Sequence, residues 1–225
     1  MPYQHEPIAL LPPAAADDRT LITHLTQLIN KVYAVAERGL WIEGTARTST
    51  EEMATLVRAG EIAVARVAGE IAGSIRVRRV PAGNGVPMGH AGDAGDAGDA
   101  GDAGGEGGAG GRSDAGDIGE FGMLVTAPAH RGSGIGRALI DFTEHHTRTQ
   151  GLTTMQLELL VPQTWIHPSK ATLHKWYTRL GYTPITTHPL PDSHPHLSPY
   201  LATPCDVRVY QKPLGPPEGV PAGTS

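Results

Sequence analysis

The sequence of 225 residues contains a single cysteine, Cys205, and no long run of apolar residues. One cysteine cannot form an internal disulfide, which agrees with a protein of the reducing cytoplasm. A membrane-spanning helix needs about eighteen or more consecutive apolar residues, and the N-terminus has no basic stretch ahead of an apolar one. We therefore expect a cytoplasmic protein that neither spans a membrane nor carries an export signal.

Positive charge is also scarce. Lysine and arginine number 18 against 23 aspartates and glutamates, which gives a formal net charge of −5. Residues 82–117 hold seven of the acids and one arginine, so the rest of the chain is close to neutral. No basic cluster of the kind that binds nucleic acid is visible, and we expect no nucleic-acid partner.

The segment 82–117 differs from the rest of the chain in composition. Residues 92–103 are four Gly-Asp-Ala triplets, which contain no proline to pre-set a collagen-like geometry. Such a segment cannot bury enough apolar surface to fold, so we predict a disordered insertion between two strands. We predict a single domain over residues 1–213 and a second disordered segment over 214–225.

Residues 120–140, EFGMLVTAPAHRGSGIGRALI, are the most informative part of the chain. An alternating apolar run indicates a buried strand that Pro128 ends. A helix follows, because Ile135, Leu139, Phe142 and His146 recur at helical spacing. The polar side of that helix is formed by Arg137, Asp141, Glu144 and Arg148. Between strand and helix, a glycine-rich turn can present several backbone N–H groups to an anion, and the helix N-terminus adds partial positive charge. The pattern predicts a phosphate site.

Other glycine-rich motifs fit less well. A P-loop requires a Lys-Ser or Lys-Thr pair after the glycines, and none is present. The dinucleotide fingerprint is matched by Gly132 and Gly134, and Glu158 is predicted near the end of the next strand, about where a ribose-binding acid would lie. Arg137, however, stands where the third glycine of the fingerprint belongs. A tight strand-to-helix turn with no ligand is the remaining alternative.

In this context, Arg131-x-x-Gly134-x-Gly136 resembles the pyrophosphate signature of the GNAT (GCN5-related N-acetyltransferase) superfamily. The expected elements support the resemblance, since their order is β-α-α-β-β-β-α-β-α-β-β over residues of about 8–213. The expected strands are at 8–11, 62–67, 71–80, 120–125, 155–161, 183–187 and 206–211. The first expected helix runs from caps at 17–18 to about 39, and the second from a Ser49-x-x-Glu52 capping box to 60. The third helix begins at 135, and the fourth covers 169–180. The resemblance implies an α/β acyl-CoA N-acyltransferase fold, with a mixed central sheet flanked by helices.

The resemblance also implies the co-substrate, acetyl-CoA, and the residues that hold it. In the family, the strand before the turn parts from the strand after the helix, and the pantetheine arm lies in the gap. The implied cofactor residues are Leu124, Val125, Thr126, Arg131, Gly132, Ser133, Gly134, Ile135, Gly136 and Arg137. Many members have an asparagine at the position of Lys170, which here could contact coenzyme A instead.

Acetyl transfer to an amine requires a proton acceptor, because a primary amine is mostly protonated at neutral pH. By resemblance, Glu120 is the preferred base, acting directly or through water, and Glu158 is the alternative. Tyr177 lies in a Tyr-x-x-x-Gly-Tyr pattern that resembles the family's general acid for the coenzyme A sulfur. The same tyrosine also shares a helical face with core residues, so a purely structural role is the competing interpretation.

The acceptor is expected to be a small polar amine or amino acid. The resemblance implies that it binds near the segment between the first two helices and near the last strand connection, and the candidate residues are Glu37, Trp41, Arg47, Glu158 and His167. The histidines lack partners at ligand spacing, so no metal site is expected. A homodimer remains open, as does a non-catalytic acyl-CoA-binding regulator.

Overall fold

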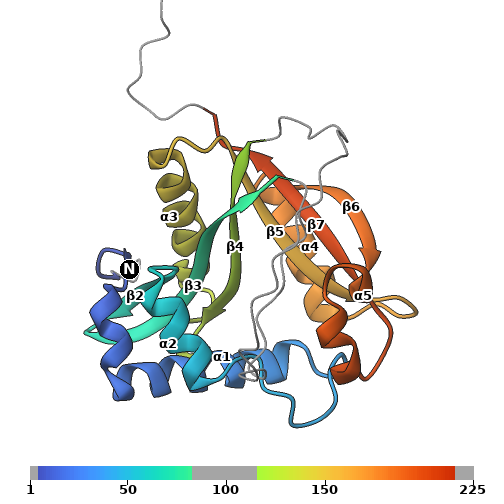
Figure 1. Ribbon diagram of the computed structural model, residues 1–225, viewed down its shortest axis with the longest axis horizontal. Coiled ribbons are helices and arrows are strands. Elements are labelled where there is room, and N and C mark those ends of the chain that lie inside the picture. Colours follow the sequence, from blue (N-terminus) through green and yellow to red (C-terminus); the bar gives the residue numbers. More distant parts are fainter. Residues whose placement is uncertain (1–4, 83–115, 216–225) are drawn as a thin grey trace, which may run out of the picture.

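The computed structural model describes residues 5–82 and 116–215, which form a seven-stranded sheet with helices on both faces (Figure 1). Of the predicted disordered segments, 82–117 and 214–225, residues 83–115 and 216–225 lie outside the described residues. The described ends differ from the prediction, because Asp117 begins a strand and Leu214 is 7% exposed, with its N–H donating to the Thr153 carbonyl at 2.7 Å. The strands are β1 (Ala9–Leu10), β2 (Ile62–Val67), β3 (Glu70–Pro81), β4 (Asp117–Thr126), β5 (Thr154–Pro162), β6 (Thr183–Pro189) and β7 (Cys205–Pro213). The α-helices are α1 (Arg19–Ala36), α2 (Thr50–Arg58), α3 (Ile135–Thr149), α4 (Pro168–Arg179) and the short α5 (Leu190–Ser193).

The order of strands and helices matches the order predicted from the sequence, with α5 added between β6 and β7. The strands lie in the order β1-β2-β3-β4-β5-β7-β6, and the sheet is mixed because β4 and β5 are parallel while all other neighbours are antiparallel. A parallel connection requires a crossover, and α3 provides it.

The parallel strands β4 and β5 stay together over a very short distance. Their ladder has two residue pairs, Gly119 with Met155 and Glu120 with Gln156. Beyond Glu120 the strands part, so the sheet opens into a V toward their C-terminal ends (Figure 1). The seven-stranded sheet therefore consists of two halves, β1–β4 and β5–β7, joined at the vertex of the V.

A β-bulge at Met123 accompanies the opening. Met123 has a left-handed φ of 48°, and the register with β3 shifts at this point. A bulge bends its strand and reverses which face the following side chains occupy. Phe121 accordingly packs in the core on the α3 and α4 side, whereas Met123 and Val125 pack with α1 and α2. The uninterrupted alternation predicted for this strand is wrong at Met123.

The helix starts follow the capping signals. Asp18 accepts from the backbone N–H groups of Thr20 and Leu21, at 3.0 and 3.1 Å, and begins α1. Ser49 accepts from the N–H of Glu52 at 3.1 Å and begins α2, as expected for an N-cap.

The prediction for one side of α3 is wrong. Glu144, predicted on the polar face, is 4% exposed. Its carboxylate accepts from the Tyr182 hydroxyl at 2.9 Å and from Lys212 Nζ at 2.7 Å. Phe142 and His146, placed on the inner face, are half-buried. Periodicity could not reveal this, because the partners of Glu144 come from the end of the chain.

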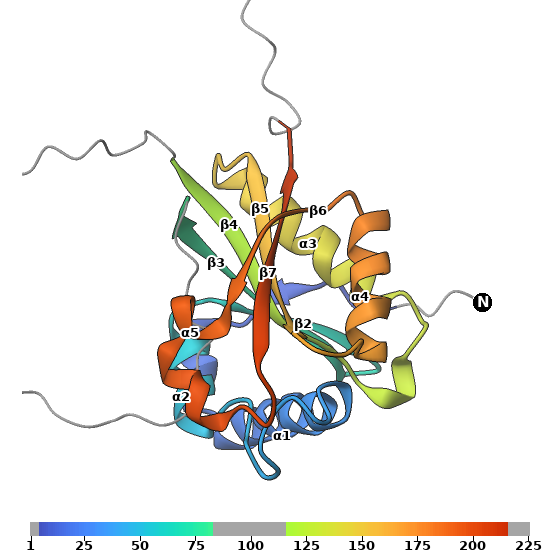
Figure 2. The same cartoon turned by 90° about the vertical axis from the view of Figure 1, so that its right-hand side faces the viewer.

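Helix α1 crosses the open end of the V (Figures 1 and 2). Most of its apolar side chains pack against the β1–β4 half, in a cluster with α2. Just past its C-terminus, Leu40 packs instead with Val207 and Leu197 of the other half. The carbonyl of Leu40 accepts from the Ala202 N–H at 2.9 Å. The helix and the residues after it therefore connect both halves of the sheet across the mouth of the V.

Candidate active site

A cavity of about 240 Å³ lies in the opening between β4 and β5. Its walls come from both strands and from helices α1 and α4, and it includes Leu124, Val125 and Thr126 on one side and Glu158 on the other. Strand edges that face each other without pairing leave backbone N–H and C=O groups in need of a partner. The open sheet thus forms a slot whose walls can hydrogen-bond an extended ligand.

The glycine-rich turn borders this cavity. Gly132 and Gly134 have φ values of 77° and 90°, in the left-handed region that favours glycine. Gly134 is the N-cap of α3, and the first intrahelical bond runs from the Ala138 N–H to the Gly134 carbonyl. The preceding N–H groups of Ile135 and its neighbours have no helical acceptor, so the turn and helix end carry donors of the kind that can bind an anion.

Some side chains of the turn have partners within the protein, and one lines the cavity. Arg131 lines the cavity. The Ser133 hydroxyl donates to the His130 carbonyl at 2.6 Å, and Arg137 forms an exposed ion pair with Asp141 at 2.8 Å. Ile135 is buried in the core, so it can offer a ligand only its backbone. The turn would therefore hold a phosphate mainly through main-chain groups.

Gly136 tests whether this site fits a coenzyme. A Cβ at this position would stand 3.4 Å from both the Thr126 hydroxyl and the Trp176 ring. Thr126, Gly136 and Trp176 all line the cavity, so a side chain here would fill its narrow part. The glycine leaves room between the glycine-rich turn and the slot, and a pyrophosphate joined to a slender pantetheine arm, as in acetyl-CoA, would fit this shape.

Glu120, predicted as the base, lies behind the vertex of the V. Its side chain accepts from Arg78 at 2.6 and 3.0 Å and from the Gln156 amide at 3.1 Å. It is not among the residues that line the cavity. Burial raises the pKa of Glu120, and the adjacent Arg78 guanidinium opposes that rise. The structure thus gives Glu120 protein partners at both oxygens.

Glu158 lies two residues beyond the last β4–β5 pair, where the strands have parted. It lies within β5 rather than at its end, so the predicted strand-end location is wrong. Its Oε2 is 2.9 Å from His194 Nε2, while Oε1 is buried without a hydrogen-bond partner. The residue lines the cavity.

Tyr177 lines the same cavity from α4 and is 6% exposed. Its ring packs among Phe121, Tyr182 and Tyr210 with centroid distances of 6.1 to 6.2 Å. Burial raises the pKa of Tyr177 far above its ordinary value of 10.0. The hydroxyl therefore keeps its proton throughout the working pH range and can donate it in a hydrogen bond. The core packing and the cavity position are compatible, so the two interpretations of this residue do not exclude each other.

Three predicted residues form one buried cluster. Lys170 of α4 forms an ion pair with Glu37, just past α1, and both are about 5–6% exposed. The second Glu37 oxygen accepts from Trp41 Nε1 at 2.7 Å. Burial would raise the pKa of Glu37, but Lys170 and Arg47 hold it below its ordinary value. Lys170 and Glu37 both line the cavity, and the pair ties α1 to α4.

A second cavity of about 530 Å³ lies beside the first, in the segment after α1. Tyr33, Glu37 and Arg47 line both cavities, and Trp41 lines the second. The Arg47 guanidinium lies 5.1 Å from the centre of the Tyr33 ring. Burial raises the pKa of Tyr33 to about 12, with Arg47 opposing the rise. The shared wall makes the second cavity a candidate acceptor site.

His167, predicted in the acceptor site, lines neither of these cavities. Its Nδ1 accepts from the Ser169 N–H at 3.2 Å and caps α4, and its Nε2 is 3.2 Å from the Arg38 carbonyl. The prediction of a direct acceptor contact disagrees with this geometry. The ring instead joins the start of α4 to the segment after α1.

The described residues contain neither a candidate metal centre nor a candidate membrane-spanning helix. No group of three or more His, Cys, Asp or Glu side chains there is arranged to hold a metal ion. No helix in residues 5–82 and 116–215 is long and apolar enough to cross a membrane.

A mixed sheet that opens around a cavity, with a glycine-rich turn and helix N-terminus at its rim, defines a coenzyme-binding α/β acyltransferase. The sequence model of the acetyltransferase (GNAT) domain matches residues 58–184. The chain therefore belongs to the GNAT family of acetyl-CoA-dependent N-acetyltransferases. No curated protein sequence matches it significantly.

Solved structures share the fold at low sequence identity. Mosquito arylalkylamine N-acetyltransferase-like 5b has a TM-score of 0.59 and 11% identity, covering 93% of this chain and 100% of its own. Ribosomal-protein-alanine N-acetyltransferase from Brucella melitensis has a TM-score of 0.54 and 15% identity, with coverages of 92% and 99%. The protein yncA from Salmonella typhimurium, solved with its cofactor acetyl-CoA, has a TM-score of 0.53 and 16% identity, with coverages of 97% and 98%.

Sequence reasoning missed Tyr33 and the contact of His194 with Glu158. Tyr33 stands four residues before Glu37, which puts the two on one side of α1, so the spacing could have revealed it. His194 belongs to a proline-rich segment without periodicity, which suggests a loop near the acceptor, but only the fold brings it to Glu158.

Proposed function

We propose that the chain transfers the acetyl group of acetyl-CoA to a primary amine by direct attack in a ternary complex. The observation that carries the proposal is the cavity between β4 and β5, which Glu158 and Tyr177 line together beside the glycine-rich turn. When bound there, acetyl-CoA supplies a thioester carbonyl as the electrophile and a thiolate as the leaving group.

The backbone of Leu124, Val125 and Thr126 would hold the pantetheine arm, and Arg131 with the turn from Gly132 to Arg137 would hold the pyrophosphate. The strand residues Leu124–Thr126 form part of the wall of the cavity, and the turn contributes Arg131 and Gly136 to its lining. The fixed N–H groups require no reorganisation when charge arrives, which favours tight anion binding.

We assign the base to Glu158 in place of Glu120. Glu158 faces the cavity with one unpartnered oxygen, whereas the carboxylate of Glu120 is bonded to Arg78 and Gln156. Glu158 Oε1 takes a proton from the attacking amine, and the Tyr177 hydroxyl donates a hydrogen bond to the departing sulfur. Proton transfer by a positioned side chain contributes roughly 100- to 10,000-fold to a rate.

The acceptor is a small polar amine or an amino acid that enters through the second cavity. Two acids, two cations and two aromatic rings line it, namely Glu37, Glu43, Arg38, Arg47, Tyr33 and Trp41. A mixed lining of this kind suits an amine with a polar or aromatic part. Lys170 neutralises Glu37 at the wall between the cavities.

The test is the release of coenzyme A thiol from acetyl-CoA with a panel of amines. The panel contains the protein amino acids, tyramine as an arylalkylamine and a hexapeptide with N-terminal alanine. We expect at least one amine to give saturable turnover that falls by roughly 100-fold or more in Glu158→Gln, with unchanged binding of acetyl-CoA. Glu120→Gln serves as the matched control. An equal or larger loss of kcat in Glu120→Gln, or full activity in Glu158→Gln, would contradict the assignment.

If acetyl-CoA binds but no amine of the panel releases thiol, the transferase proposal loses its support. A non-catalytic acyl-CoA-binding role would then explain the cavity, and binding would be indifferent to Tyr177→Phe.

A further inference from the structure

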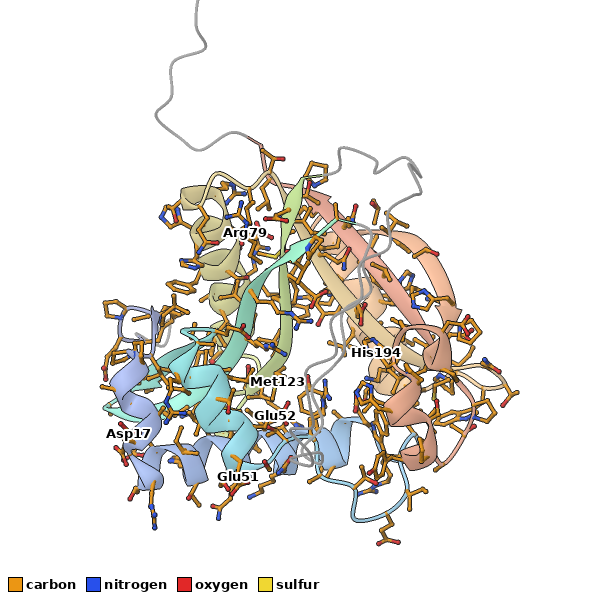
Figure 3. All side chains as sticks on the ribbon, viewed as in Figure 1. Asp17, Glu51, Glu52, Arg79, Met123 and His194 are labelled. Atoms are coloured by element: carbon orange, nitrogen blue, oxygen red, sulfur yellow. The ribbon has the colours of Figure 1, made fainter. Side chains whose placement is uncertain are left out.

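His194 is fully buried beside Glu158, although it lies 36 residues further along the chain. It directly follows α5, in the connection between β6 and β7, and its Nε2 is 2.9 Å from Glu158 Oε2. Figure 3 shows His194 beside the β5–β7 half of the sheet, across the opening from Met123 on β4. A histidine with no solvent exposure in contact with a cavity carboxylate is well placed to control that carboxylate.

The segment that carries His194 is held firmly. The backbone N–H of His194 donates to the Leu190 carbonyl at 2.8 Å, and the His194 carbonyl accepts from the Leu197 N–H at 3.0 Å. Leu190 and Leu197 are completely buried in the core of the β5–β7 half. The imidazole position is therefore fixed by the fold and does not depend on a ligand.

The two oxygens of Glu158 have different surroundings. Oε2 contacts His194, while Oε1 is buried and has no hydrogen-bond partner. A buried polar atom without a partner is costly to maintain and is rare in native proteins, where a catalytic role is one of the reasons for keeping it. Because an ionised carboxylate only accepts hydrogen bonds, the contact requires the proton to be on Nε2.

We propose that His194 is a positioning residue for acetyl transfer, which rests on the proposed role of Glu158 as base. The Nε2–H group donates to Oε2, fixes the rotamer of Glu158 and leaves Oε1 directed at the amine. No bond to His194 forms or breaks. The amine proton goes to Oε1, and His194 acts on the reaction only through Glu158.

The test is a double-mutant cycle in the full chain with His194→Leu, Glu158→Gln and the double variant. Misplacing a catalytic group by about 1 Å costs on the order of 100-fold. We expect His194→Leu to lower kcat by roughly 10- to 100-fold with the amine of highest kcat/KM in the panel, with the KM for acetyl-CoA unchanged within about twofold. In the Glu158→Gln background, His194→Leu is expected to have no further effect on kcat, because groups that act as a unit are not additive.

Two further variants separate positioning from folding. His194→Gln retains an N–H donor near the position of Nε2 and should keep kcat within about threefold, a rescue that a titrating role would not allow. His188→Leu removes the 2.9 Å contact of His188 Nε2 with Ser193 Oγ in the same segment, without touching Glu158. It should leave kcat unchanged.

Several outcomes would overturn the inference while leaving the role of Glu158 intact. One is that the losses of kcat for His194→Leu and Glu158→Gln multiply in the double variant. Another is that His188→Leu loses as much kcat as His194→Leu, and a third is that His194→Gln does not restore kcat. Full activity in Glu158→Gln instead contradicts the proposed base, and the inference with it. Melting temperatures of the wild-type protein, the two single variants of the cycle and the double variant test the same contact without an acceptor amine. Strictly additive stability changes would show that His194 and Glu158 do not interact.

Discussion

Replacing Lys170 by methionine should destabilise the protein strongly and in a pH-dependent way. Methionine keeps the apolar volume but leaves the Glu37 carboxylate buried without its principal ion partner. Removing one member of a buried pair typically costs about 3–5 kcal/mol. For a domain of this size, each kcal/mol lowers the melting temperature by about 2–4 °C, so we expect a loss of roughly 6–20 °C.

The sign of the pH dependence follows from the pKa of Glu37. In the native protein this pKa lies below its ordinary value of 4.5, since Lys170 and Arg47 outweigh the effect of burial. Its contribution to stability is therefore present above pH 4.5 and is lost as the pH falls through the folded-state value. Without Lys170 the pKa of Glu37 rises, so the penalty of Lys170→Met is largest at pH 8 and shrinks as the pH falls toward 5.

The assay is thermal unfolding followed by circular dichroism between pH 5 and 8, without ligand. Lys175→Met, on an exposed position of the same helix, is the control and should change stability by no more than about 0.5 kcal/mol. Glu37→Gln combined with Lys170→Met should recover part of the loss, because the carboxylate that lost its principal ion partner is then removed as well. Equal melting temperatures for the two methionine variants, or a penalty that grows as the pH falls, would refute the reasoning.

Three further predictions concern the cavity. Gly134→Val places a β-branched residue at a φ of 90° in the phosphate-binding turn and should weaken acetyl-CoA binding by about tenfold or more in calorimetric titration, since the turn must distort. Gly60→Val, equally strained at a φ of 73° but outside the cavity, should cost similar stability and leave the affinity unchanged. Tyr177→Phe should lower kcat by roughly 100-fold or more without weakening acetyl-CoA binding, while Tyr182→Phe, which loses its bond to Glu144, should lower stability but not kcat. Acetyl-CoA at about 100 times its Kd should stabilise the native state by about 2.7 kcal/mol, and a melting temperature that ignores the ligand would contradict a preformed coenzyme site.

The glycine-rich turn between a strand and a helix was predictable from the sequence. The spacing of Arg131, Gly134 and Gly136 between an apolar strand and an amphipathic helix carries a local physical meaning, because the turn and the helix end are built from consecutive residues. The order of strands and helices along the chain was predictable for the same reason, since most elements are signalled by their periodicity and capping residues.

The catalytic and acceptor parts were less predictable, because they depend on residues far apart in the chain. Glu120 and Glu158 both follow the same strand pattern, and only the end of the β4–β5 ladder at Glu120 separates a paired carboxylate from one that faces the cavity. The bulge at Met123 and the burial of Glu144 likewise arise from tertiary contacts that no local pattern encodes. Histidine is a residue type that often binds ligands, but in this fold the His167 side chain caps helix α4.

Because α1 and the residues after it contact both halves of the sheet, the spacing between these halves depends on the length of one helix. The helix has 18 residues, which corresponds to about 27 Å at 1.5 Å per residue. Substitutions along its exposed side leave that length unchanged. A single inserted residue, however, would turn Glu37 by about 100° around the helix axis, away from Lys170, and shift every contact on the far side by a fraction of a turn. The acetyltransferase site should therefore tolerate much variation in the composition of α1 and very little in its number of residues.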